Sequence, residues 1–277
     1  MRAQRDFAER IENMVNATKL TRVQQDELND KLIDAVKNGD IKNVRELIEN
    51  GADVNAKDKN RWTALFWAAC SGKFDISTFL IEKGADVDAK SNYGKTALHW
   101  AAFFGHVDFA KVLIENRADV DAKDKNGETA LHAAALNGHV DISKFLIENR
   151  ADVDAKNNIG WTALHWAALY GHFDVAKFLI EKGADVDAKD KNNEIAVEVA
   201  IRCDRHQIAE LIENSFTLLI SPFVAAAINL SLSSSCCICV NFVVFTIISI
   251  LSAKSLNIPI FCSIYQFIIK LFLLHLC

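Results

Sequence analysis

The first 215 residues contain no proline and only two cysteines. Pro222 and Pro259 both lie beyond this segment, and its cysteines, Cys70 and Cys203, are far apart in the sequence. Two isolated cysteines do not provide the network of disulfide bonds that stabilises many small secreted domains. This composition indicates a reducing compartment.

The chain begins without an uninterrupted apolar run. Its first 25 residues alternate charged side chains such as Arg5 and Arg10 with apolar ones such as Ile11, so no cleavable export signal is expected. The glycosylation pattern at Asn16 is therefore expected to be unused, because that modification requires export.

Acidic residues are missing from the end of the chain. All 36 lie at or before Glu213, and the net charge of the chain is −5. An acidic first part without a basic cluster argues against nucleic acid as the partner. Glycine also ends early, with Gly183 as its last occurrence, so a domain boundary is expected near Ser215.

Motifs of catalysis and cofactor binding are also missing. Residues 1–215 contain no glycine-rich phosphate loop, no recognisable nucleophile motif and no Cys-x-x-Cys pair. We therefore expect no enzyme activity, no cofactor, no metal site and no small-molecule substrate.

Three short motifs recur every 33 residues. The first is Gly/Arg-Ala-Asp-Val, which begins at Gly51, Gly84, Arg117, Arg150 and Gly183. The second is Thr-Ala-Leu, which begins at Thr63, Thr96, Thr129 and Thr162. The third is Gly-His, which begins at Gly105, Gly138 and Gly171. A fixed period of this length is typical of a solenoid whose units stabilise one another by stacking.

With these motifs, residues 28–215 resemble the ankyrin-repeat family. The resemblance implies an all-α solenoid in which each 33-residue unit is a β-turn followed by two antiparallel helices. The family usually has proline after the threonine of the second motif, and here alanine stands at all four positions: Ala64, Ala97, Ala130 and Ala163. Because alanine is the best ordinary helix former, the expected fold is unchanged.

The repeats predict the following domains. A charged, helical N-terminal lead covers 1–27, an N-terminal cap 28–50, four repeats 51–83, 84–116, 117–149 and 150–182, and a C-terminal cap 183–215. The caps are expected to tolerate water on their outer sides. Asn43 and Glu46 replace apolar residues in the first cap, and Asp204-Arg205 replace Gly-His in the last.

Six histidines also recur at two fixed positions in the repeat. They are His99, His132 and His165, and His106, His139 and His172. Metal binding is the alternative to consider, but the residues are spread one per unit along the stack. The resemblance implies a structural role, in which they hydrogen-bond to turns and neighbouring helices.

The resemblance also implies that partners contact the turn tips and the first helix of each unit, where this sequence varies. The tip positions are Trp62, Tyr93, Lys95, Glu128, Ile159 and Trp161. The positions at the ends of the first helices are Phe103, Phe104, Leu136, Asn137, Leu169 and Tyr170. Exposed aromatic residues often concentrate interface energy, so this surface is the predicted site for a protein partner.

Three details of that surface leave alternatives open. Trp62 and Trp161 are as well explained by covering the preceding turn as by binding. Trp67, Trp100 and Trp166 are expected to serve packing. Arg61 stands where other repeats have glycine, so the turn before Trp62 is expected to have a different shape.

Residues 216–277 form an apolar tail without any acidic residue or glycine. Its runs 216–232, 236–253 and 257–277 predict two or three transmembrane helices, since a spanning helix needs about 20 apolar residues. The alternative is the translation product of a shifted reading frame, because real spanning helices usually contain glycine.

These observations predict a protein–protein adaptor, with its ankyrin domain in the cytoplasm and its tail in a membrane. Without a genuine tail the protein would be cytoplasmic. The alternative function is a small transport or channel-like membrane protein regulated by the repeats, for which Lys270 and a few polar tail residues are the available support.

Overall fold

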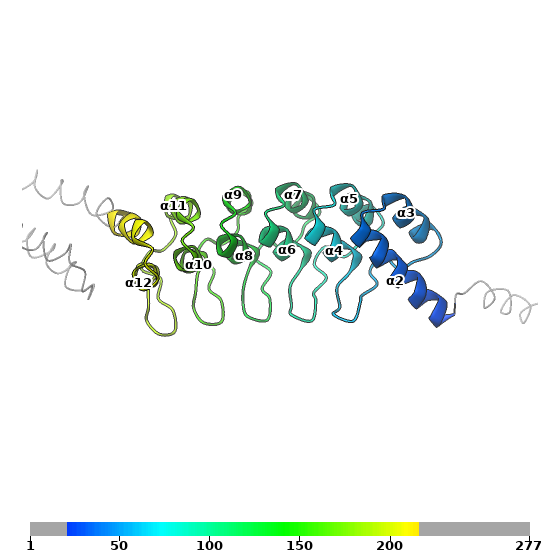
Figure 1. Cartoon of the computed structure of the whole chain (residues 1–277), viewed down its shortest axis with the longest axis horizontal. Helices are drawn as coiled ribbons and strands as arrows, with labels where there is room; N and C mark the ends of the chain where they lie inside the picture. Colours follow the sequence, from blue (N-terminus) through cyan, green and yellow to red (C-terminus); the bar gives the residue numbers. More distant parts are fainter. Residues whose placement is uncertain (1–20, 216–277) are drawn as a thin grey trace, which may run out of the picture. The chain divides into compact units, whose positions relative to one another are not determined.

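A computed structural model describes residues 21–215 of the chain. Residues 21–212 of this segment belong to one compact unit. A second unit begins at Glu213. Within the first unit, helices stack in pairs along a row, with long connections projecting from one side (Figure 1). No strand occurs in the described segment, so the all-α prediction is confirmed there.

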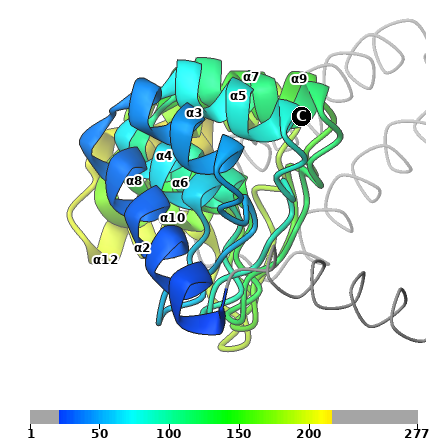
Figure 2. The same ribbon diagram turned by 90° about the vertical axis from the view of Figure 1, so that its right-hand side faces the viewer.

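Each pair has an inner helix, next to the projecting connections, and an outer helix (Figures 1 and 2). The inner helices are α2 (Arg22–Asn38), α4 (Ala64–Ser71), α6 (Ala97–Phe104), α8 (Ala130–Asn137), α10 (Ala163–Tyr170) and α12 (Ala196–Arg202). The outer helices are α3 (Ile41–Glu49), α5 (Phe74–Glu82), α7 (Val107–Glu115), α9 (Val140–Glu148) and α11 (Phe173–Glu181). The chain is helical again over 206–215. Helix α2 begins before residue 28 and extends into the predicted lead.

The inner helices α4, α6, α8 and α10 begin at the alanines that replace the usual proline. Ala64 is the first residue of α4, and the preceding Thr63 caps the helix by accepting a hydrogen bond from the Phe66 N–H at 3.3 Å. The inner helices carry small buried residues such as Ala101 and Ala102, both 0% exposed. Small side chains let each of the helices α4, α6, α8 and α10 pack against the inner helices on both sides of it.

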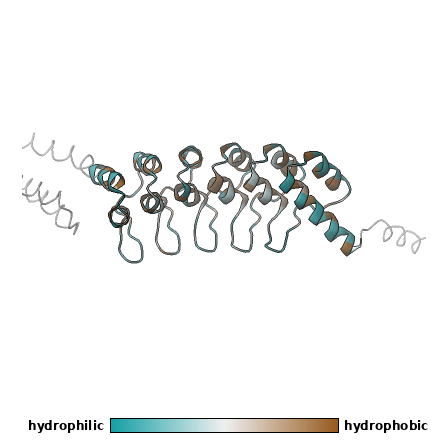
Figure 3. Cartoon of the chain, viewed as in Figure 1, coloured by the Kyte–Doolittle hydropathy of each residue, from teal (hydrophilic) through white to brown (hydrophobic). Residues whose placement is uncertain are grey.

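Both ends of the stack have polar faces, as the cap prediction expects. Asn43 and Glu46 are exposed on α3, and Glu198 and Asp204 are exposed at the other end. Figure 3 shows the hydrophilic character of α2 and of the connections, compared with the more apolar central helices. Glu198 also replaces a structural histidine, since its carboxylate accepts a hydrogen bond from the Ile195 N–H at 2.9 Å.

The turn before Trp62 keeps the backbone conformation of the other repeats, so the expected difference in shape is wrong. Arg61 has a φ of +60°, close to the +78° of Gly94 and the +64° of Asn193. The hydrogen bonds of the turn impose this conformation, and a non-glycine residue is strained there by about 1 kcal/mol.

His99 connects its own helix to the next repeat. Its Nδ1 accepts a hydrogen bond from the Thr96 N–H at 3.2 Å, and its Nε2 donates to the Glu128 carbonyl at 3.0 Å. These two roles require a neutral ring with its proton on Nε2. His132 and His165 make the same pair of contacts in the next two repeats.

Two histidines of the second set bond to the C-terminal ends of inner helices. The Nε2 of His139 lies 3.0 Å from the Phe103 carbonyl, and the Nε2 of His172 lies 2.9 Å from the Leu136 carbonyl. These contacts satisfy carbonyl groups that a helix end leaves without an internal partner. The structural role implied by the resemblance is therefore confirmed for these histidines.

Among the helices of residues 21–215, none is both long and apolar enough to cross a membrane. The spans predicted in 216–277 lie outside the described residues and stay a prediction.

The buried histidines predict that acid destabilises the stack. Burial lowers the pKa of His99 to about 4, and burial also lowers the pKa values of His132 and His165. Between pH 6.5 and about 4 the unfolded chain binds protons that the folded chain does not, so the free energy of unfolding falls as the pH falls. For His99 alone we expect a loss of roughly 2 kcal/mol at pH 5 relative to pH 7.

Urea unfolding at the two pH values measures this loss, with His99→Gln as the control. Glutamine keeps one acceptor and one donor but does not titrate in this range. The variant should therefore lose less stability on acidification. Equal losses in both proteins would show that His99 is not the responsible group.

Candidate protein-binding surface

The predicted surface is built on five turn tips, which comprise residues 57–62, 90–95, 123–128, 156–161 and 189–194. In the third tip, Asp124 Oδ1 accepts hydrogen bonds from the N–H groups of Asn126 at 2.7 Å and Glu128 at 3.0 Å. Asp58, Asn157 and Asp190 fold the first, fourth and fifth tips in the same way. Short side-chain acceptors of this type fix a turn without other packing.

Ser91 takes that position in the second tip and makes weaker contacts. Its Oγ lies 3.3 Å from the backbone nitrogens of both Tyr93 and Lys95. A serine hydroxyl also lacks the second oxygen that an aspartate can direct toward a neighbour. The second tip is therefore the least tightly folded of the five by this measure.

Backbone hydrogen bonds join adjacent tips. The Lys125 N–H donates to the Tyr93 carbonyl at 3.0 Å, and the Lys191 N–H donates to the Ile159 carbonyl at 3.0 Å. Equivalent bonds join Asn92 to Asn60 and Asn158 to Asn126. The tips therefore hold a common register, in which the last residue of one tip faces the second residue of the next.

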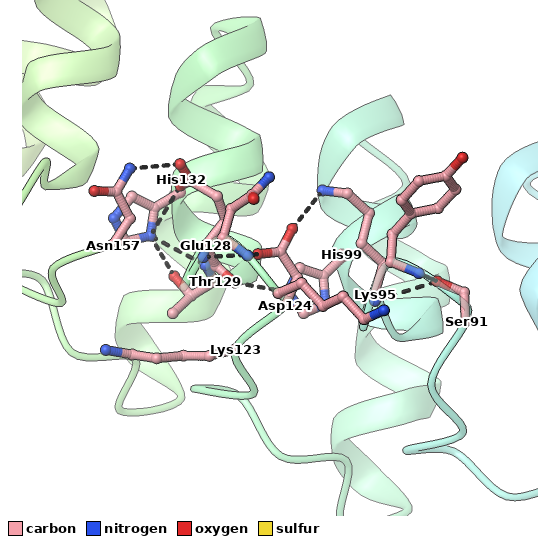
Figure 4. Close-up of polar contacts among 12 residues, drawn as sticks. Ser91, Lys95, His99, Lys123, Asp124, Glu128, Thr129, His132 and Asn157 are labelled. Atoms are coloured by element: carbon pink, nitrogen blue, oxygen red, sulfur yellow. Dashed lines mark hydrogen bonds and ion pairs between the residues drawn. The ribbon is translucent and has the colours of Figure 1, made fainter. Parts of the chain in front are cut away.

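These facing positions form a bonded pair at three of the four boundaries between tips. Lys95 Nζ lies 3.1 Å from Asp124 Oδ2, whose side chain is 1% exposed. The Asn157 amide donates to Glu128 Oε1 at 2.6 Å (Figure 4). At the last boundary, the Trp161 indole N–H donates to Asp190 Oδ2 at 3.1 Å. Lys95, Glu128 and Trp161 therefore have partners inside the stack.

The boundary between Trp62 and Ser91 has no such bond. The Trp62 Nε1 is buried and has no hydrogen-bond partner among the described residues, and the same holds for the Trp100 Nε1. Trp166, which occupies the position of Trp100 two repeats later, donates to Glu128 Oε2 at 3.2 Å. Trp62 stands where Glu128 does and offers no acceptor, so both unpaired donors follow from the residues at this one boundary.

Aromatic side chains gather around these two donors. We call Trp62, Phe66, Trp67, Trp100, Phe103 and Phe104 the N-terminal aromatic cluster. Ring centroids are 4.7 Å apart between Trp62 and Trp67, 5.6 Å between Trp62 and Trp100, and 5.7 Å between Trp100 and Phe104. Contacts at these distances are typical of favourable aromatic pairs.

A smaller aromatic group lies in the fourth repeat. Trp161 and Trp166 have centroids 4.8 Å apart, and Trp166 stacks on Tyr170 at 6.1 Å. The third repeat has Ala133 at the tryptophan position and Asn137 at the position of Tyr170. The aromatic surface is therefore divided into two patches by a repeat without aromatic residues at these positions.

The predicted binding residues differ in exposure. Tyr93 is 63% exposed, Phe104 42%, Ile159 49% and Tyr170 49%. The others are only partly exposed: Trp62, Lys95, Phe103, Glu128, Leu136, Asn137, Trp161 and Leu169. The four exposed side chains are the part of the prediction that remains available to a partner without rearrangement.

Trp67 and Trp100 are predicted to serve packing. The structure places both in the aromatic cluster, where Trp67 also forms a hydrogen bond and Trp100 has an unpaired indole N–H. Both are partly exposed members of the N-terminal aromatic cluster. The Trp67 indole donates to Asp58 Oδ2 at 3.3 Å, and Lys37 Nζ lies 4.5 Å from the ring centroid. In the sequence, each of these tryptophans lies four residues after the threonine of its repeat, which predicts a place on the inner helix. This spacing does not predict which indole lacks a hydrogen-bond acceptor.

Comparison with known proteins agrees with this architecture. Residues 32–124 and 116–190 each match the family described as ankyrin repeats in three copies, and together they cover more than half of the chain. The chain belongs to the ankyrin-repeat family. Ankyrin repeats imply interaction with other proteins, and the family is generally non-enzymatic.

Two proteins of Rickettsia felis, both named as ankyrin repeat proteins, are similar to part of this ankyrin-repeat chain. One is 42% identical over 57 residues, which are 21% of this chain and 90% of the relative. The other is 43% identical over 53 residues, which are 19% of this chain and 80% of the relative. Their similarity supports the same family.

The Trp161 indole N–H has an acceptor and the Trp62 indole N–H has none. Removing the N–H is therefore expected to lower the free energy of unfolding more at Trp161 than at Trp62. Trp161→Phe breaks a hydrogen bond to a charged acceptor and leaves Asp190 without that donor, which costs about 1–3 kcal/mol. Trp62→Phe removes a buried donor that has no partner, so the gain from losing this unsatisfied group offsets part of the cost of the smaller ring. We expect Trp161→Phe to lower the free energy of unfolding by at least about 1 kcal/mol more than Trp62→Phe.

Urea unfolding of the two variants at pH 7 measures the difference. The substitution is the same in both, so the change in ring size largely cancels. If Trp62→Phe proved as destabilising as Trp161→Phe, the Trp62 N–H would have an acceptor in solution.

Proposed function

We propose that this ankyrin-repeat protein is an adaptor that binds another protein through its tips and the ends of its inner helices. The observation that carries the proposal is the set of exposed large apolar side chains on this surface: Tyr93, Phe104, Ile159 and Tyr170. Exposed aromatic residues in a rigid setting lose little conformational entropy on binding and are common at interface hot spots.

The rigidity of this surface supports the proposal. Backbone bonds between adjacent tips hold Tyr93 and Ile159 in register. Phe104 and Tyr170 are the last residues of α6 and α10, each of which packs against its neighbouring inner helices. A surface that is ordered before binding needs little rearrangement when a partner docks.

Binding is therefore expected to depend on Phe104 and Tyr170. After a partner has been identified by crosslinking, Phe104→Ala and Tyr170→Ala should each weaken affinity by tenfold or more, as for hot-spot residues worth about 2 kcal/mol. Phe74→Ala is the matched control, because Phe74 is 45% exposed but lies on the outer helix α5.

Isothermal titration of the purified proteins measures these affinities. Full affinity in both the Phe104 and Tyr170 variants would reject the proposed surface. A loss in the Phe74 variant of equal size would instead indicate that the partner contacts the outer helices.

The adaptor is further proposed to be held at a membrane by residues 216–277, with the repeats in the cytoplasm. The support is the sequence of this segment, whose apolar runs have about the length that a spanning helix needs. This part of the proposal is independent of the binding surface.

Membrane partition tests the anchor. The full chain should resist carbonate extraction from membranes, whereas a chain ending at Ser215 should be extracted and show a helical circular dichroism spectrum. Pelleting of the full chain in the absence of membranes would indicate aggregation and contradict the anchor.

A further inference from the structure

The N-terminal aromatic cluster contains two hydrogen-bond donors without acceptors. They are the Nε1 groups of Trp62 and Trp100, which are both buried in the described part of the chain. An unpaired buried donor is costly in a folded protein, and native structures contain few of them. The ring centroids of these two residues are 5.6 Å apart, so both donors belong to the same local group of aromatic side chains.

The other tryptophans show which acceptor suits an indole in this protein. Trp67, Trp161 and Trp166 each donate to a carboxylate oxygen, at 3.3, 3.1 and 3.2 Å respectively. The chain has five tryptophans in all. Trp62 and Trp100 therefore differ from the rest by lacking a carboxylate, which has two oxygens able to accept from two donors.

The charge of the neighbouring tips points to the same chemistry. The tip at 57–62 has three basic residues and one acidic residue, and the tip at 90–95 has two basic residues and no acidic one. The acidic residue is Asp58, whose oxygens already accept hydrogen bonds from the turn and from Trp67. The tips at 123–128 and 189–194 have equal numbers of basic and acidic residues, and the tip at 156–161 has one basic residue and no acidic one. Even with Lys95 paired to Asp124, the first two tips keep more basic than acidic residues. Positive charge is thus concentrated beside the two unpaired donors.

We propose that the N-terminal aromatic cluster binds a partner segment in which an acidic residue lies beside an apolar one. The carboxylate accepts hydrogen bonds from the Trp62 and Trp100 indoles, and the apolar side chain packs on Phe104. This inference rests on the proposed function and specifies the chemistry of the partner. Charged acceptors form the stronger class of hydrogen bonds, so this contact supplies specificity as well as affinity.

Binding at this place includes a change of rotamer. The two nitrogens are covered in the free protein, while the rings that contain them are partly exposed. A carboxylate reaches them when one of the two indoles, or a side chain that covers it, changes rotamer. Side-chain changes of this kind are common at interfaces whose backbone moves little.

The test is a selection of random 12-residue peptides on the full-length protein in mild detergent. Wild-type protein should enrich peptides with aspartate or glutamate next to an apolar residue. A peptide from this set should bind at least tenfold more tightly than its copy with asparagine or glutamine in place of the acid, which corresponds to the loss of about one charged hydrogen bond.

Variants of the protein locate the contact. The double substitution of Trp62→Phe and Trp100→Phe should weaken binding of the selected peptide about tenfold or more, because it removes both donors and keeps aromatic rings. The matched control combines Trp161→Phe and Trp166→Phe, whose indoles already have carboxylate partners. This control should bind the peptide as the wild type does.

Ser91 offers a second pair of variants. Ser91→Asp should supply the Trp62 indole with an internal acceptor, as Asp190 does for Trp161, and compete with the peptide. Ser91→Asn should fold the tip in the same way, as Asn157 does, but direct an amide N–H toward the facing residue. We expect a severalfold loss of peptide affinity for the first variant and no loss for the second.

Asn60→Asp controls for charge alone, since Asn60 is exposed on the neighbouring tip. Its effect should vanish at high salt, while the effect of Ser91→Asp should persist.

The inference fails if selected peptides show no preference for acidic residues, if no peptide is enriched, or if the Trp62 and Trp100 double variant binds as the wild type does. The proposed function is judged separately. It stands if Phe104→Ala and Tyr170→Ala weaken binding of the crosslinked partner, and it falls if they do not, whatever the peptides show.

Discussion

The stack depends on one bridging interaction, the neutral histidine that caps an inner helix and bonds to the next repeat. His99 accepts from Thr96 on one side and donates to the Glu128 carbonyl on the other. Because both contacts use the same ring, the start of α6 and the end of the following tip are held at a fixed separation. His132 and His165 repeat the constraint. It supports the register at three of the four boundaries between tips. At the first boundary Phe66 stands at the histidine position, and the bond from the Asn92 N–H to the Asn60 carbonyl holds the same register.

With the register fixed, the repeats differ in the residues that face each other at the boundary between two tips. One boundary has an ion pair, between Lys95 and Asp124, and another has the amide–carboxylate contact of Asn157 with Glu128. At a boundary whose facing residues bond to each other, fewer polar groups are left to bond to a partner. The exception at Trp62 leaves two buried donors unpaired within a cluster of aromatic side chains, which is why we locate specificity there.

The last repeat shows which residue the glycine position accepts when no further repeat packs against it. In the interior, Gly105 has a φ of +74°, and a Cβ there would lie 2.9 Å from His139 Nδ1 of the next repeat. Asp204 holds the equivalent position in the last repeat at a φ of +57° and is exposed. No further repeat follows in the described segment, so the steric reason for glycine is absent and a polar residue can face water.

The sequence by itself determined the repeat length, the helix pairs, the capping threonines and the family, because these features recur with a fixed period. It determined the polar ends because there the residues depart from that period. It also predicts which surface a partner would bind, and this stays a prediction. Only the tertiary structure decided that Lys95, Glu128 and Trp161 bond inside the stack, and that the Trp62 and Trp100 indoles do not. These outcomes depend on contacts across repeat boundaries, between side chains about one repeat apart. A period predicts which positions are equivalent, but their differing partners appear only when the units are stacked.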